Sequence, residues 1–297
     1  MSQNLVLGVD IGGSHVTVGI VDLQTNSILA GSKSRLDLDS KGDLESILDI
    51  WQKAIEKSGK LVGMKPNRLG ISMPGPLDYE KGISLISGQD KYEALFGLNI
   101  KELLATRLDF SITQISFIND AVAFLKGEIL GGSARGGKNV IGLTLGTGLG
   151  SAKSLNNKEA MDADLWKMPF KESIAEEYIS TRWFVKRYLE KTSNKVDNVK
   201  ALYALAESGN IPALEVFQEF GFNLGEFLQL FIAMEGEIDT VVLGGNIAKT
   251  ANLFTGEVLK VLGSGSKVAI KQAILGEDAA LIGAAGIWKA EKAQALD

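Results

Sequence analysis

The chain has 297 residues, of which 45% are hydrophobic and 23% are charged, as is typical of a folded globular protein long enough for two domains. Its formal net charge is −5 and its basic residues form no dense block, so we expect no nucleic-acid partner. The absence of cysteine excludes disulfides, thiolate zinc sites and cysteine nucleophiles.

The start of the chain leads directly into an apolar strand pattern, without the basic flank and apolar stretch of a signal peptide. The most apolar window, residues 220–234, is interrupted by polar side chains and is too short to cross a bilayer. We therefore expect a cytoplasmic protein that has no membrane partner.

The first predicted element is a hairpin over residues 5–21, in which two apolar runs flank the turn Gly12, Gly13 and Ser14. The pattern recurs over residues 140–155, around the turn Gly146, Thr147 and Gly148. Aligning the two hairpins places Gly12 opposite Gly146. This repeat predicts two related half-domains with a cleft between them.

Between and beyond the hairpins, strand patterns alternate with helical ones, which predicts mixed α/β sheets flanked by helices. The remaining predicted elements are a strand over 28–35, a helix over 44–57, a strand over 68–73, a helix over 100–107, a strand over 115–118, a helix over 121–130, helices within 173–234, a strand over 240–243 and a helix over 279–289.

We predict two domains from this order of elements. The first is a smaller N-terminal α/β domain of residues 1–118, completed by a C-terminal helix at about 279–297. The second is a larger α/β domain of residues 119–278 with a helical insertion.

The glycine turns suggest phosphate binding, because a turn without side chains lets backbone N–H groups approach an anion. Each turn alone is better explained as a tight hairpin, but this explanation weakens because the two turns share a register and one has a carboxylate at its strand end. Asp10 ends the first strand and could hold Mg²⁺ or its water ligands, which would neutralise phosphate oxygens. The glycines Gly244 and Gly245 form a third junction, where adenine could lie against the backbone or a helix could simply begin.

Asp120 follows an apolar strand in the middle of the chain. Such a carboxylate could accept the proton of a hydroxyl group that attacks a γ-phosphate. The N-cap preference of aspartate equally allows Asp120 to cap the helix that is predicted to start at Ala121, and both roles can coexist. His15 is the single histidine, so no histidine metal cluster or Ser-His-Asp triad is possible, and it has no assigned role.

Taken together, these segments resemble the ROK family of sugar kinases and regulators, within the group that shares the two-domain actin and hexokinase fold, which is ribonuclease H-like. The matching motifs, in chain order, are Gly8–Ser14, Pro74–Asp78, Ile118–Ala121 with Gly127-Glu128, Leu145–Gly150, Val242–Gly245 and Ala280–Ala285.

The resemblance implies a role for each matching residue. Asp120 would be the general base, Asn119 and Gly75 would contact the sugar, and Asp10 would hold Mg²⁺. ATP would be held by Gly12, Gly13, Ser14, Gly146, Thr147, Gly148, Gly244 and Gly245. A homodimer is also expected from the resemblance.

The sequence departs from the family on the sugar side. Family members carry a Gly-Glu-x-Gly-His stretch and a cysteine-rich zinc loop, whereas residues 163–169 read Ala-Asp-Leu-Trp-Lys-Met-Pro and no cysteine follows. We therefore expect no structural zinc. Asp164 stands in place of a sugar-binding Glu, Lys167 replaces the histidine, and Glu176 resembles the later sugar-binding Glu.

The leading hypothesis is an ATP- and Mg²⁺-dependent kinase that phosphorylates a hexose, most simply glucose at its 6-OH. One alternative is a sugar-responsive transcriptional regulator. Regulators of the family carry a DNA-binding domain ahead of the first glycine motif, which here begins within ten residues of the start. The other alternative is a nucleotide-binding homologue with a degenerate sugar site.

Overall fold

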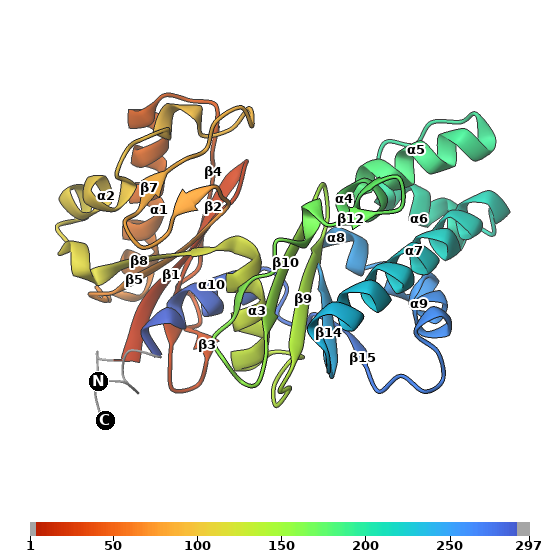
Figure 1. The fold of residues 1–297 in the computed structure, drawn as a ribbon. Helices are drawn as coiled ribbons and strands as arrows, with labels where there is room; N and C mark the ends of the chain where they lie inside the picture. Colours follow the sequence, from red (N-terminus) through yellow and green to blue (C-terminus); the bar gives the residue numbers. More distant parts are fainter. Residues whose placement is uncertain (1–3, 290–297) are drawn as a thin grey trace. The chain divides into compact units, whose positions relative to one another are not determined.

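The computed structural model describes residues 4–289 (Figure 1). These residues divide into two compact units, one of residues 4–135 with 277–289 and the other of residues 136–276. Each unit has its own sheet and its own hydrophobic core. The predicted domain boundaries at 118 and 278 stay a prediction.

The first unit contains a six-stranded mixed sheet with the order β3-β2-β1-β5-β8, and β4 also pairs with β2. Its strands are β1 (Leu5–Ile11), β2 (His15–Asp22), β3 (Ser27–Ile28), β4 (Ser34–Asp37), β5 (Leu69–Met73) and β8 (Ile115–Asn119). β1 and β2 form the predicted antiparallel hairpin, whereas β1, β5 and β8 are parallel. The parallel register places Asp10 beside Ser72 and Met73 beside Asn119, so polar side chains meet at the carboxyl ends of the strands.

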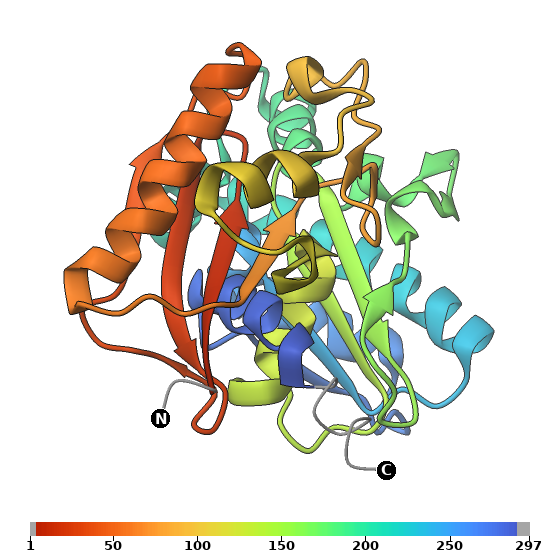
Figure 2. The ribbon, with the colours of Figure 1, turned by 90° about the vertical axis from the view of Figure 1, so that its left-hand side faces the viewer.

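Helices cover both faces of this sheet (Figure 2). They are α1 (Leu44–Val62), α2 (Ile100–Leu108), α3 (Asp120–Gly131) and α10 (Asp278–Ala285), and the connections contain β6 (Leu77–Asp78), β7 (Ile83–Ser84), η2 (Glu93–Leu95) and η3 (Ile112–Gln114). Because side chains alternate along a strand, the two faces of β1 meet different helices. Leu7 and Val9 pack in one core with Trp51 of α1.

The opposite face of β1 meets α10 at Gly8. A Cβ atom at this position would lie 2.3 Å from the carbonyl oxygen of Leu281, so only a glycine allows the helix to pack directly on the strand backbone. α10 also packs closely against α3. α3 therefore belongs to the first unit together with α10.

The second unit contains a five-stranded sheet with the order β11-β10-β9-β14-β15. Its strands are β9 (Val140–Leu145), β10 (Leu149–Ser154), β11 (Met161–Asp162), β14 (Thr240–Gly244) and β15 (Ala269–Gln272). β9 and β10 form the second predicted hairpin, and β9, β14 and β15 are parallel. The series β10-β9-β14-β15 thus repeats the arrangement of β2-β1-β5-β8, and the repeat extends beyond the hairpins.

The second unit is rich in helices, as predicted. After η4 (Leu165–Lys167) and the short pair β12 (Pro169–Phe170) and β13 (Ser173–Ile174) come α4 (Ala175–Tyr178), α5 (Thr181–Thr192), α6 (Val199–Glu207), α7 (Ile211–Glu235), α8 (Gly245–Ala248), η5 (Ala251–Leu253) and α9 (Thr255–Leu262). An aromatic cluster joins these helices, with ring centroids 4.5 Å apart for Phe184 and Phe220 and 5.0 Å apart for Phe220 and Phe254.

Two predicted elements differ from the structure. The single strand over 28–35 is wrong, because Gly31 adopts a left-handed φ of 78° and separates β3 from β4. The closing helix is interrupted by a turn at Gly286, since α10 ends at Ala285 and helix resumes over residues 287–289, and residues 290–297 of the prediction lie outside the described residues. Within residues 4–289, no helix has both the length and the apolar character that a membrane span requires.

Candidate functional site

Asp10 lies partly buried at the carboxyl end of β1. The hydroxyl group of Ser72, on the neighbouring strand β5, donates a hydrogen bond of 2.9 Å to the Asp10 carboxylate. Burial raises the pKa of Asp10 from 3.8 to about 6, and the negative charges of Asp120 and Glu277 act in the same direction. Asp10 is therefore an acidic group that a nearby cation would stabilise in its charged form.

Asp10 and Asp120 fit a Mg²⁺ ion that is bound mainly by phosphate, rather than one that is held by protein ligands alone. Among residues 4–289, no three His, Cys, Asp or Glu side chains lie close enough together to hold a metal ion. Mg²⁺ in nucleotide sites, however, binds through one or two carboxylates and completes its shell with phosphate oxygens and water. The Asp10 carboxylate, with the charge of Asp120 nearby, suits such a phosphate-bound ion.

Asn119 and Asp120 lie where β8 ends and α3 begins. The side-chain oxygen of Asn119 accepts hydrogen bonds from the backbone N–H groups of Ala121 at 2.9 Å and Val122 at 3.2 Å. Asn119 is therefore the N-cap, and the possibility that Asp120 is the N-cap residue is wrong, although the Asp120 carboxylate also accepts a hydrogen bond from the Ala121 N–H at 2.9 Å. Asp120 is instead the first residue of α3, and it is exposed at the helix terminus, where the helix dipole stabilises its negative charge.

Tyr79, which the sequence did not indicate, connects the predicted sugar-binding residues of the first unit. The side-chain N–H₂ of Asn119 donates to the Tyr79 hydroxyl at 3.2 Å, and this hydroxyl donates to the Met73 carbonyl at 3.2 Å. A Cβ atom at Gly75 would lie 3.0 Å from the same hydroxyl oxygen. Gly75, Asn119 and Asp120 thus lie at one edge of the sheet. Their contact with a sugar stays a prediction.

The first glycine turn, Gly12 to Ser14, exposes two backbone donors. It is closed by hydrogen bonds from Gly12 N–H to the His15 carbonyl at 3.0 Å and from Leu38 N–H to the Ser14 carbonyl at 2.9 Å. The buried Tyr92 hydroxyl donates to the Gly12 carbonyl. Within the part of the chain that the structure describes, the N–H groups of Gly13 and Ser14 have no protein acceptor.

His15 gains a local role in this turn. Its Nδ1 atom lies 3.2 Å from the Ser14 hydroxyl oxygen, within hydrogen-bonding distance. The side chain therefore helps to hold Ser14 at the end of the turn.

The second glycine turn, Gly146 to Gly148, rests on α4 and on the start of α5. The Gly146 carbonyl accepts a hydrogen bond from Thr181 N–H at 2.8 Å, and the Glu176 carboxylate accepts one from Leu149 N–H at 3.0 Å. Among the described residues, no acceptor pairs with the N–H groups of Thr147 and Gly148. The repeated backbone therefore presents two unpartnered donors at each turn.

Glu176 lies directly against the second turn. A Cβ atom at Gly148 would be 2.5 Å from one oxygen of its carboxylate, and the other oxygen accepts a hydrogen bond from Arg182 at 2.9 Å. The predicted sugar-binding Glu thus contacts the predicted phosphate turn. Whether it also binds sugar stays a prediction.

Gly244 and Gly245 adjoin the second turn. Gly244 pairs with Thr144 in the sheet, and Gly245 has a φ of 82°. A Cβ atom at Gly245 would lie 2.4 Å from the Leu145 carbonyl oxygen, so this position needs glycine. The structure therefore brings together the two groups of predicted nucleotide-binding residues in the second unit.

Asp164 and Lys167 form an ion pair at η4. Asp164 precedes η4 with a left-handed φ of 52°, and its side chain is 45% exposed. The carbonyl of Met168 accepts a hydrogen bond from Ala175 N–H at 2.9 Å, which connects this segment to α4 and thereby to Glu176. Residues 163–169, which differ most from the family pattern, are therefore connected to α4, whose Glu176 supports the second turn.

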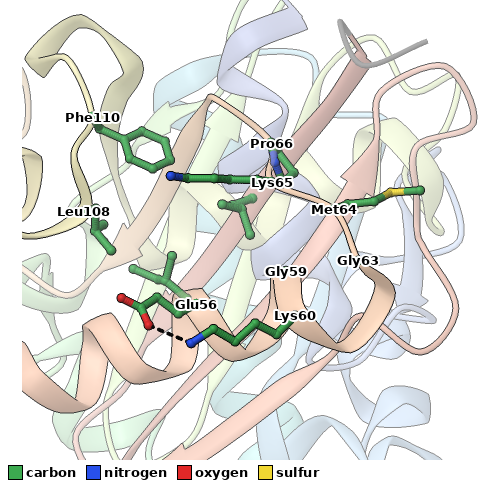
Figure 3. Close-up of a pocket in the computed structure, with 11 residues that line it drawn as sticks. Glu56, Gly59, Lys60, Gly63, Met64, Lys65, Pro66, Leu108 and Phe110 are labelled. Atoms are coloured by element: carbon green, nitrogen blue, oxygen red, sulfur yellow. Dashed lines mark hydrogen bonds and ion pairs between the residues drawn. The ribbon is translucent and has the colours of Figure 1, made fainter.

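A separate apolar pocket of about 420 Å³ lies elsewhere in the first unit, between the ends of α1 and α2 (Figure 3). Leu7, Met64 and Phe110 are among its lining residues, and the pair Lys60–Glu56, at 3.1 Å, lies at its side. None of the predicted site residues lines it. Leu7 lies in the amino-terminal half of β1, whereas Asp10 lies near the carboxyl end of the same strand, beside the first glycine turn. The pocket is therefore distinct from the candidate site.

Comparison with protein-family models matches residues 6–161 and 171–291 to the ROK family. The chain belongs to the ROK family. The gap in the match, residues 162–170, contains Asp164 and Lys167. The family model thus passes over the segment in which the sugar-side motif and the zinc loop are altered.

Two curated relatives of this chain are sugar kinases. A glucokinase of Thermotoga maritima is 31% identical over 150 residues, which are 50% of this chain and 44% of that protein. The match therefore spans less than half of that relative. An N-acetylgalactosamine kinase of a Shewanella species is 24% identical over 275 residues, with 83% of both chains covered.

A ROK glucokinase of Streptomyces griseus, solved in complex with glucose and AMPPNP, aligns with a TM-score of 0.73. The identity is 23%, and the alignment covers 95% of this chain and 98% of that one. The predicted actin- and hexokinase-like fold is confirmed. The chain is a ROK homologue of sugar kinases that lacks the cysteine-rich zinc loop.

Proposed function

We propose that this ROK protein is an ATP- and Mg²⁺-dependent sugar kinase that transfers the γ-phosphoryl group to a hexose hydroxyl, most simply the 6-OH of glucose. The observation that supports it best is in the first unit. There a partly buried Asp10, an exposed Asp120 at a helix terminus and a glycine turn with two unpartnered N–H groups occur together. Phosphoryl transfer needs these three features: an anion-binding turn, an acidic group for Mg²⁺ and a base.

Asp120 would act as the general base. Its carboxylate would accept the proton of the sugar hydroxyl while the hydroxyl oxygen bonds to the γ-phosphorus. The bond from that phosphorus to the bridging oxygen breaks, and ADP leaves with the electron pair. Because Asn119 caps α3, the Asp120 side chain is not required for the cap and can serve this purpose.

The glycine turns would hold the phosphates. Their unpartnered backbone N–H groups can donate to phosphate oxygens without displacing any protein hydrogen bond. Mg²⁺, when bound at Asp10, would supply positive charge to the phosphates and relieve the repulsion between Asp10 and Asp120.

The test is the variant Asp120→Asn. We expect glucose phosphorylation to fall by about 10²- to 10⁴-fold, because the amide cannot accept the proton, while ADP affinity stays within about twofold. A coupled assay of ADP release and calorimetry of ADP binding measure the two quantities. Asp109→Asn is the matched control, since Asp109 is an exposed aspartate at the end of α2 in a left-handed conformation that Asn tolerates. Full activity of Asp120→Asn would contradict the proposal.

A second candidate function is nucleotide binding with a degenerate sugar site. It is favoured by two ion pairs, because Asp164 binds Lys167 and Glu176 binds Arg182, so both predicted sugar-binding acids of the second unit already have cationic partners. Assaying ATP turnover with glucose, mannose, N-acetylglucosamine and N-acetylmannosamine separates the candidates. Turnover with any of them favours the kinase, whereas tight ADP binding without turnover favours the second candidate.

A further inference from the structure

The first glycine turn depends on the orientation of one peptide group. The carbonyl of Gly12 and the N–H of Gly13 belong to the same planar peptide unit and point in opposite directions. The Tyr92 hydroxyl donates to the Gly12 carbonyl. The N–H of Gly13, which has no protein acceptor among the described residues, therefore points away from Tyr92.

This peptide group needs an anchor. It lies between two glycines, whose backbone rotations meet little steric resistance. A Cβ atom at Gly13 would meet no atom within 4 Å, so packing does not restrain the turn there. If the peptide flipped, the Gly12 carbonyl oxygen would face the side where Gly13 now presents its N–H. That side would then repel a phosphate rather than bind it.

The surroundings of Tyr92 hold its hydroxyl in place. The residue is fully buried, and its ring packs against Trp51 with centroids 5.9 Å apart. Its backbone has a left-handed φ of 56°, which is uncommon for tyrosine, and its N–H donates to the Ser40 carbonyl at 2.6 Å. Burial and the charge of Asp10 raise the pKa of the Tyr92 hydroxyl, so it remains a donor at neutral pH.

The second turn shows the same arrangement with a different donor. Gly146 occupies the position that corresponds to Gly12, and its carbonyl accepts a hydrogen bond from the backbone N–H of Thr181 at 2.8 Å. The N–H that follows in the same peptide unit is that of Thr147, which also has no acceptor among the residues described. The repeat therefore fixes the equivalent peptide twice, by unrelated groups.

We propose that Tyr92 is a positioning residue for the nucleotide phosphates, because its hydroxyl locks the Gly12–Gly13 peptide so that Gly13 N–H faces a phosphate oxygen. Thr181 N–H does the same for the second turn. This inference rests on the proposed function, since it requires that the turns bind a nucleotide.

The test is Tyr92→Phe, which keeps the buried ring and removes the donor. Calorimetry is carried out with ADP and, in parallel, with adenosine, which lacks phosphate. We expect ADP to bind about 5- to 10-fold more weakly, as for the loss of one hydrogen bond, and adenosine to bind as in the unmodified protein. Tyr188→Phe is the matched control, because Tyr188 is a buried tyrosine of α5 outside both turns, and its ADP affinity should not change.

Each other outcome would overturn the inference. Unchanged ADP affinity in Tyr92→Phe would show that the hydroxyl does not position the turn. An equal loss for ADP and adenosine would show that the tyrosine supports the unit as a whole. If the unmodified protein bound neither ADP nor ATP, the proposed function would fail together with this inference. If the unmodified protein bound ADP but Tyr92→Phe bound it equally well, only the inference would fail.

Discussion

The two glycine turns have the same backbone plan and different supports. The first is held by a buried phenol and lies near a carboxyl group with a raised pKa. The second is held by a backbone N–H and by the Glu176 carboxylate, whose charge is partly balanced by Arg182. The comparison indicates that the unpartnered N–H donors are the common property of the turns. The side chains around them can differ because they need only keep the peptide groups oriented.

The largest expected effect is on ADP affinity, when a glycine of the first turn that faces open space is replaced. Gly13→Ala should lower ADP affinity by about tenfold, because the methyl group would occupy space through which a phosphate approaches the backbone. The melting temperature of the Gly13→Ala variant should not change, since no protein atom lies within 4 Å of the added Cβ. Calorimetry and thermal unfolding measure these effects, and unaltered ADP binding would remove the first turn from the nucleotide site.

The raised pKa of Asp10 predicts that the stability of the first unit depends on pH. Because the folded pKa of about 6 exceeds the ordinary 3.8, the folded state holds the proton more tightly than the unfolded chain. This contribution to stability is complete below pH 3.8 and is lost as the pH rises through 6.

Asp10→Asn should therefore match the unmodified protein in stability below pH 4 and exceed it by about 1–3 kcal/mol above pH 6, without nucleotide or Mg²⁺. Urea unfolding at pH 4 and at pH 7.5 tests this expectation. If the difference in unfolding free energy between Asp10→Asn and the unmodified protein were the same at both pH values, Asp10 would not titrate in this range.

Gly148→Ala should destabilise the second unit by about 1 kcal/mol, because the new Cβ would displace the Glu176 carboxylate and break its hydrogen bond with Leu149 N–H. Gly146→Ala is the matched control, since its Cβ would meet no atom within 4 Å. Equal stability of the two variants in urea unfolding would show that Glu176 does not support the turn.

Glu176→Gln should have the smallest effect on stability, below about 1 kcal/mol. The glutamine oxygen can still accept from Leu149 N–H, and the lost ion pair with Arg182 is largely solvent-exposed on the arginine side. Glu177→Gln, which removes a longer contact of 3.4 Å with the same arginine, is the control. If Glu176→Gln lost much more stability than Gly148→Ala, the charge of Glu176, rather than its hydrogen bond, would hold the turn.

The sequence predicted those parts of the fold that depend on short-range patterns. Both hairpins, the parallel strands after them and the helix after β8 follow from alternating or periodic apolar residues. The possibility that Asp120 is the N-cap of α3 was wrong, because Asn119 and Asp120 are both good N-cap residues and only the backbone decides between them. The strand over 28–35 was wrong because a single left-handed glycine interrupts it.

Tyr79 and Tyr92 could not be found from the sequence. They lie in an irregular segment without helical or strand periodicity, and their hydroxyls bond to groups elsewhere in the first unit. Tyr92 is 80 residues from its acceptor Gly12. Such contacts depend on tertiary structure, and the only local indication is that a tyrosine stands where phenylalanine would fill a core equally well.

The packing of α10 on the backbone of β1 has a consequence for how the protein forms. The sheet that contains the earliest strands has one face closed by a helix encoded some 270 residues later. During synthesis that face stays exposed until the whole second unit has left the ribosome, so nascent chains of intermediate length are the species most in need of a chaperone.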